Sequence, residues 1–78
     1  MDWKERITCD PAVLMGKPVI RGTRLSVGLL LDLYAQGWSE QEVLENYPQI
    51  DSEDLRAAFA YSSARIDGEE LIPVRFGT

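Results

Sequence analysis

The chain has 78 residues, of which 45% are hydrophobic and 27% are charged, and its formal net charge is −5. A chain of this length has room for one domain with a modest core, because only around 60% of its unfolded surface can be buried. One cysteine and no histidine exclude an internal disulfide, a mixed cysteine–histidine zinc site and imidazole-dependent catalysis. We therefore expect one non-enzymatic binding domain over residues 1–78, without a metal or cofactor, that gains stability by association with another chain.

The sequence carries no apolar run near the 18 residues that a membrane-spanning helix needs. Its first residues, MDWKER, lack the apolar stretch of a signal peptide. We expect a cytoplasmic protein without a membrane partner. The cytoplasm is a reducing compartment and suits a free Cys9.

The charge is divided along the chain. Residues 1–25 contain five basic and three acidic side chains, a net charge of +2, whereas residues 26–78 contain three basic and ten acidic ones, a net charge of −7. Such a division bears on the choice of partner more than on the fold.

The first quarter, residues 7–25, is punctuated by proline and glycine. Alternation around Ile7–Cys9 and Lys17–Arg24 predicts short strands or extended pieces joined by tight turns. Gly22 has the position of a turn residue with positive φ.

Three N-cap residues then predict three helices. Ser39 is followed three residues later by Glu42, the spacing of a capping box, and Asp51 stands in the same relation to Asp54. Ser26 is a weaker cap without an acid at the third position. Gly37 and Pro48 are the stop signals. The predicted helices cover 27–36, 40–46 and 52–66.

Each predicted helix has an apolar face at the 3.6-residue period. These faces consist of Val27, Leu30, Leu31 and Tyr34 in the first helix, Val43, Leu44 and Tyr47 in the second, and Leu55, Ala58, Phe59, Ser62 and Ile66 in the third. The expected fold class is mainly α: a three-helix, helix-turn-helix bundle over 26–66, preceded by short β segments.

The remaining residues, 67–78, open with a turn at Asp67-Gly68 and then alternate Ile72, Val74 and Phe76. This pattern predicts a short C-terminal strand, and Pro73 marks it as an edge strand. The three apolar residues are candidate partner-binding residues, since such a strand can add to the sheet of another protein.

The helical spacing is that of a DNA-binding helix-turn-helix, but the charge opposes this reading. The last helix of such a unit approaches the DNA with its first turn, which here reads Asp51-Ser52-Glu53-Asp54. Carboxylates at that place work against the phosphate contacts that supply DNA affinity. We expect the third helix to be structural or to face a protein.

A basic segment around Gly22 holds the candidate DNA- and phosphate-binding residues Lys17, Arg21, Thr23 and Arg24. These side chains suit a basic ribbon that meets phosphates. They would equally suit a segment that ties itself to the acidic helices, or a solvated turn with ordinary surface arginines.

Several sequence elements, in order, resemble the domain-of-unknown-function 433 family over roughly residues 7–61. They are GKPVIRGTR at 16–24, Gly-Trp-Ser at 37–39, Tyr-Pro at 47–48 and AAFAY at 57–61. The resemblance implies a helix-turn-helix-like fold of the winged-helix or homeodomain kind. It also implies a VapB-like antitoxin that pairs with a PIN-like nuclease toxin. The tail beyond Ile66 lies outside the resemblance.

Three functions stay open at this point. The first is an antitoxin that binds a PIN-like toxin and its own promoter DNA. The second is a DNA-binding regulator, dimeric and without a toxin partner. The third is a homodimeric structural module, in which a second copy covers the apolar rows of the N-terminal segment and the tail.

Overall fold

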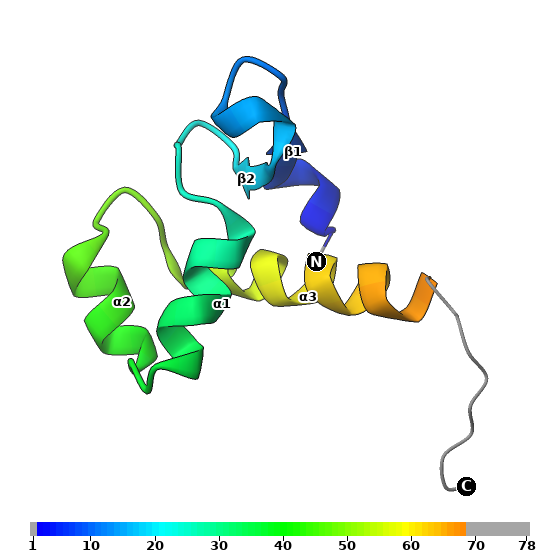
Figure 1. Ribbon diagram of the computed structural model, residues 1–78. Coiled ribbons are helices and arrows are strands. Elements are labelled where there is room, and N and C mark those ends of the chain that lie inside the picture. Colours follow the sequence, from blue (N-terminus) through cyan, green and yellow to red (C-terminus); the bar gives the residue numbers. More distant parts are fainter. Residues whose placement is uncertain (1, 69–78) are drawn as a thin grey trace, which may run out of the picture.

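A short β-ribbon leads into three helices in the computed structural model, which describes residues 2–68 (Figure 1). The elements are the single-turn 3-10 helices η1 (Trp3–Glu5) and η2 (Leu14–Gly16), the strands β1 (Ile7–Cys9) and β2 (Pro18–Ile20), and the helices α1 (Val27–Ala35), α2 (Glu40–Asn46) and α3 (Ser52–Gly68). The three predicted helices and the short N-terminal strands are thus confirmed. We call residues 2–25 the N-terminal ribbon.

Each helix begins at its predicted cap. The Ser39 hydroxyl accepts the Glu42 backbone N–H at 3.1 Å, and the Glu42 carboxylate accepts the Ser39 N–H at 2.8 Å. Asp51 and Asp54 exchange the same two bonds at 2.9 and 3.1 Å. Ser26 accepts one N–H from the first turn of α1 at 3.0 Å. The boundaries are therefore set locally, because caps satisfy N–H groups that have no partner within the helix.

The helix ends also follow the sequence signals. Gly37 has a φ of +98°, the left-handed conformation predicted for the residue that ends α1. Helix α2 ends at Asn46, directly before Tyr47 and Pro48. Helix α3 reaches Gly68, two residues beyond the predicted end.

The ribbon is an antiparallel pair that runs straight into α1. Ile7 pairs with Ile20, and Cys9 pairs with Pro18. On the other side of β2, the Ile20 N–H donates to the Leu25 carbonyl at 3.0 Å. The turn between them contains Gly22 with a φ of +82°, the positive φ that its position predicts. Both edges of β2 are thus bonded within the chain.

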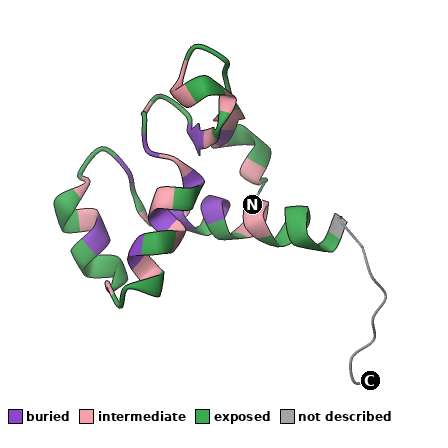
Figure 2. Ribbon diagram, in the orientation of Figure 1, coloured by how far each residue is buried: buried purple, intermediate pink, exposed green. Residues whose placement is uncertain are grey.

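The core lies where the ribbon, α1 and α3 meet, with α2 closing one side (Figure 2). Its buried hydrophobic residues are Ile7, Val19, Ile20, Leu25, Val27, Leu30, Leu33, Val43, Ile50, Leu55, Ala57 and Ala58. Four of these twelve belong to the ribbon. The ribbon is therefore a layer of the core and not a loose arm.

The predicted faces of α1 and α2 are buried only in part. Val27, Leu30 and Val43 are buried, whereas the other predicted residues of these two faces are half-buried. Leu33, outside the predicted α1 face, is buried instead, because α1 packs on both α3 and β2 and buries a broader face.

The apolar face predicted for α3 is buried over its first half only. Leu55 and Ala58 are buried, but the exposed fractions of Phe59 and Ile66 are 43% and 71%. The other elements lie over the first part of α3, and α3 continues past the rest of the molecule (Figure 1). The second half of this face has no element above it in the described residues.

The ribbon is fastened to α3 by one aromatic contact and one charged cluster. The rings of Trp3 and Tyr61 meet edge to face, with centroids 4.9 Å apart. The Arg6 guanidinium donates to Asp54 at 2.9 Å and to Asp51 at 3.2 Å. The start of the chain is thereby held against the first turn and the middle of α3.

The contribution of this charged cluster to the stability of the fold depends on pH. The Asp54 backbone N–H, and then the Arg6 charge, lower the pKa of Asp51 below its usual value. The free energy that the ionised carboxylate contributes to folding is therefore full above the unfolded pKa of about 3.9 and is lost as pH falls through the lower folded pKa. Asp51→Asn keeps an acceptor for the cap but has no charge to titrate. We expect wild type to be the more stable protein at neutral pH and this advantage to shrink in acid, measured by urea unfolding of both proteins. Parallel pH profiles of the two proteins would contradict the assignment.

Candidate functional site

Three of the four candidate phosphate-binding residues border one open groove on the ribbon. The groove has a volume of about 450 Å³ and is lined by Thr8, Asp10, Val13, Val19, Arg21, Gly22, Thr23 and Arg24. Strand pairing brings β1 residues to the turn that follows β2. The fold thus gathers Arg21, Thr23 and Arg24, whereas Lys17 faces a different groove.

Thr23 is engaged inside its own turn. Its hydroxyl donates to the Ile20 carbonyl at 2.8 Å and accepts the Leu25 N–H at 2.9 Å. Because a hydroxyl has one proton to donate, Thr23 has none left for a phosphate oxygen. In this conformation it shapes the turn that carries the two arginines.

Arg21 is bound to backbone carbonyls. Its guanidinium donates to the Lys4 and Glu5 carbonyls, each at 3.1 Å. These are last carbonyls of η1, which have no partner within that turn. Arg21 therefore closes the end of η1, and its guanidinium forms no ion pair with a carboxylate of the described residues.

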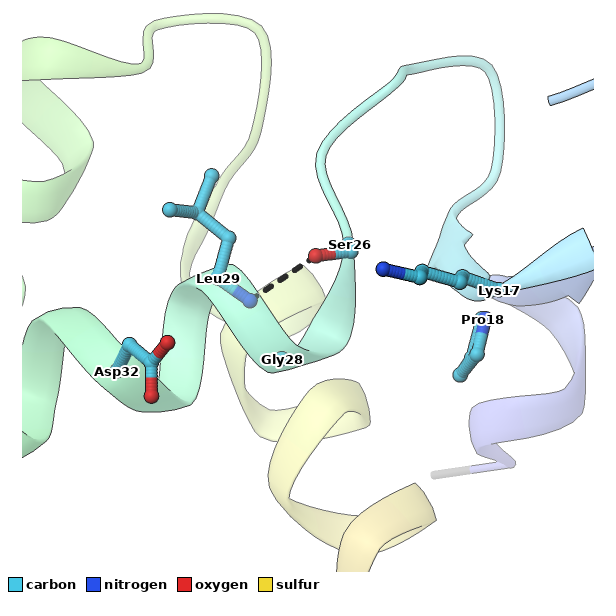
Figure 3. Close-up of a pocket in the computed structure, with 6 residues that line it drawn as sticks. All are labelled: Lys17, Pro18, Ser26, Gly28, Leu29 and Asp32. Carbon is cyan, nitrogen blue, oxygen red and sulfur yellow. Dashed lines mark hydrogen bonds between the residues drawn. The ribbon is translucent and has the colours of Figure 1, made fainter. Parts of the chain in front are cut away.

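Besides Lys4, the ribbon has two cations whose side chains the fold leaves unengaged, Arg24 and Lys17. Both are exposed, and within residues 2–68 neither side chain makes an ion pair or a hydrogen bond. Lys17 lines an open groove of about 480 Å³ at the start of α1, and Figure 3 shows it pointing across this groove toward Ser26. Asp32 lies farther along the same groove. The side chains of Lys17 and Arg24 can therefore reach an anionic partner without breaking a hydrogen bond or ion pair of the fold.

Helix α2 presents a second, acidic surface. A shallow depression of about 460 Å³ is lined by Glu40, Gln41, Leu44 and Glu45. Leu44 is its half-buried apolar lining residue, and the three polar residues are exposed. No lysine or arginine in the described part of the chain pairs with these glutamates. An apolar side chain beside exposed carboxylates is suited to a basic protein surface.

The acidic first turn of α3 is partly neutralised within the molecule. Arg6 bonds Asp51 and Asp54, and Arg56 bonds Glu53 at 2.7 Å. The sequence alone indicates Arg6 only as one of five basic residues in the N-terminal segment and predicts no role for it. The signal in the sequence is the run of acidic residues at the start of α3, which has only Arg56 nearby in sequence to pair with and so leaves carboxylates for a more distant base. The residues that the structure describes contain no group of three or more side chains placed to hold a metal ion.

The β1–β2 connection holds a feature that the sequence does not signal. Leu14 and Met15 have φ values of +48° and +59°, a conformation that costs about 1–2 kcal/mol per residue for side chains with a Cβ. Met15 is 91% exposed at this tip. Neither residue type favours positive φ, so only the following Gly16 hints at the turn.

Two further sequence predictions concern the rest of the surface. The candidate partner-binding residues Ile72, Val74 and Phe76, and the strand predicted for them, lie outside the described residues. Among the helices of residues 2–68, none has both the length and the apolar character to cross a bilayer.

The molecule is thus a small three-helix domain whose two-stranded ribbon forms part of its core, with a basic ribbon surface and an acidic α2 surface. The family described as "Protein of unknown function (DUF433)" matches residues 7–62, and the chain belongs to this family. The match begins at β1 and ends within α3, so it contains the ribbon groove and all of α2.

Two relatives agree with this assignment. A crystal structure of a DUF433 member from Anabaena variabilis is 39% identical, with a TM-score of 0.72, and the similarity covers 82% of this chain and 66% of that one. The uncharacterized protein y4eO from Sinorhizobium fredii is 39% identical over 61 residues. That match covers 78% of this chain and 28% of y4eO, so this chain spans less than a third of that relative.

The different roles of the two arginines in the groove lead to a prediction. Arg21→Ala removes both carbonyl bonds and should lower the free energy of unfolding by about 1 kcal/mol. Arg24→Ala, at an exposed side chain without such bonds, should change it by less than about 0.5 kcal/mol. Chemical denaturation of both variants beside wild type measures the difference. Equal losses of stability would show that Arg21 does not fasten η1.

Proposed function

We propose that this domain is an antitoxin-type binding protein with two separate surfaces. The acidic surface of α2 binds a basic nuclease of the PIN-like kind, and Lys17 and Arg24 of the ribbon bind phosphates of promoter DNA. The observation that carries the proposal is the separation of charge. Ribbon residues 2–25 have a net charge of +2, whereas residues 26–68, with two basic and eight acidic side chains, have a net charge of −6.

The α2 surface supports the nuclease half of the proposal. A nuclease must hold a polyanion, so its substrate cleft is lined by lysine and arginine. Glu40 and Glu45 stand around the half-buried Leu44 with a spacing of five residues and are exposed for such a cleft. An acidic surface of this kind speeds association with a basic partner, more strongly at low salt.

The ribbon supports the DNA half. Arg6 and Arg21 are engaged in the fold, which leaves Lys17 and Arg24 as the ribbon cations nearest to the two grooves. In this proposal α1, α2 and α3 form a helix-turn-helix of the winged-helix or homeodomain kind that supports the ribbon. The acidic start of α3 does not face the DNA. The α2 surface and the ribbon lie apart, on either side of α1 (Figure 1), so one molecule can meet both partners.

The alternative is a DNA-binding regulator without a toxin partner. The unpaired side chains of Lys17 and Arg24 favour it as much as they favour the DNA half above. The two functions differ in α2, whose acidic surface has no role in a regulator that binds DNA alone.

Charge reversal at each surface tests the proposal. If a PIN-like nuclease is encoded beside the gene, its activity is assayed with the purified domain, and the promoter DNA upstream of the gene is assayed by gel shift. Glu40→Lys with Glu45→Lys should slow association with the nuclease at least about tenfold at low salt and spare DNA binding. Lys17→Glu with Arg24→Glu should abolish the gel shift and spare inhibition of the nuclease.

Each pair of variants is the matched control for the other, because both change two exposed charges on the same fold. An adjacent nuclease that wild type neither binds nor inhibits would overturn the antitoxin proposal. A gel shift without any effect on the nuclease would favour the regulator, and the absence of a shift even at low salt would remove the DNA function.

A further inference from the structure

The projecting half of α3 carries a stripe of two large apolar residues and two serines that the described residues cover only at its Phe59 end. We define the α3 stripe as Phe59, Ser62, Ser63 and Ile66. At 3.6 residues per turn these positions fall on one side of the helix. Phe59 is 43% exposed and Ile66 is 71% exposed, and Figure 2 shows this end of α3 as largely exposed. Large exposed apolar residues grouped on one face mark an interaction site.

The stripe continues the contact between α1 and α3. Phe59 meets Tyr34, in the last turn of α1, edge to face with ring centroids 5.0 Å apart. Beyond this contact α1 has ended, and Ile66 extends the same row by two further turns. The aromatic contact of Tyr61 with Trp3 lies on the opposite side of α3, since two residues correspond to about 200° of rotation. The ribbon therefore leaves the stripe uncovered.

We propose that a second copy of this chain covers the α3 stripe. The two α3 helices pack antiparallel about a twofold axis that passes between Ser62 and Ser63. Phe59 and Ile66 lie at equal distances on either side of that point, so each Phe59 packs against Ile66 of the second copy. A twofold contact requires one patch to be complementary to itself. This stripe has large side chains at both ends and small serine side chains at its centre. The serines allow the two helices to approach closely.

Charge favours a second copy over a basic partner at this place. The eight residues 57–64 read AAFAYSSA and contain no charged side chain, although 27% of the whole chain is charged. Two molecules with a net charge of −5 repel each other over most of their surface, and this stretch is where they can meet with least repulsion. A basic nuclease is attracted to the acidic α2 surface instead. The dimer contact is thus independent of the proposed function.

The size of the contact sets its strength. Two exposed turns from each helix form a small interface, below the size of a permanent dimer. We therefore expect a monomer–dimer equilibrium with a dissociation constant in the micromolar range. The association also adds apolar burial to a chain of 78 residues that has little core of its own.

Sedimentation equilibrium of the full chain, from micromolar to millimolar concentration, tests the dimer. Ile66→Lys should raise the dissociation constant at least tenfold, which corresponds to about 1.4 kcal/mol. Ile66 is exposed, so this variant should keep the wild-type circular dichroism and unfolding midpoint at low concentration. Met15→Lys is the matched control: it places the same lysine at another exposed apolar residue, away from the stripe, and should leave the dissociation constant unchanged.

Both variants move the net charge from −5 to −4, which by itself favours association of an acidic protein. Loss of the dimer in Ile66→Lys but not in Met15→Lys would therefore show that the α3 stripe forms the dimer contact. The proposal is overturned if wild type stays monomeric over the whole range, as it would if its own tail or the nuclease covered the stripe. It is equally overturned if Ile66→Lys dimerises like wild type, or if Met15→Lys is as impaired as Ile66→Lys.

Discussion

The docking of the N-terminal ribbon against α1 and α3 is the contact on which the rest of this small domain depends. Three short helices bury too little apolar surface by themselves, and the ribbon supplies Ile7, Val19, Ile20 and Leu25 to the core. Arg6 then joins the ribbon to the acidic cap of α3, across 45 to 48 residues of sequence. The ribbon thereby acts as a fourth structural element that completes the core between the helices.

This docking also decides which charges remain for partners. Arg6 joins the ribbon to α3 and Arg21 closes the end of η1, so both contribute to the fold, whereas the side chains of Lys17 and Arg24 make no ion pair or hydrogen bond within residues 2–68. At the other end of α1, the glutamates of α2 have no counter-charge among the described residues. A net charge of −5 thus conceals two surfaces of opposite sign, held apart by the packed core.

The sequence predicts the features that depend on near neighbours and misses those that depend on distant ones. The capping pair of Ser39 and Glu42 and the positive φ of Gly37 follow from a few adjacent residues, and both are confirmed. The Arg6 cluster depends on how the ribbon docks, which no local pattern encodes. The periodicity of α3 predicts an apolar face that continues to Ile66, yet Ile66 is exposed because α3 continues past the elements that pack against its first half, which the pattern in α3 does not encode. For the candidate site, the sequence predicts a basic turn but cannot separate the roles of its cations.

Amide hydrogen exchange tests the docking of the ribbon most directly. The Ile20 N–H bonds the Leu25 carbonyl at 3.0 Å, and the Arg21 N–H bonds the Arg6 carbonyl at 2.7 Å. If the ribbon is a layer of the core, both amides should exchange only through global unfolding, with the same opening free energy as the buried Leu30 in α1. Fast exchange of the two ribbon amides while Leu30 stays protected would show that the ribbon is a detachable arm, and would contradict this account.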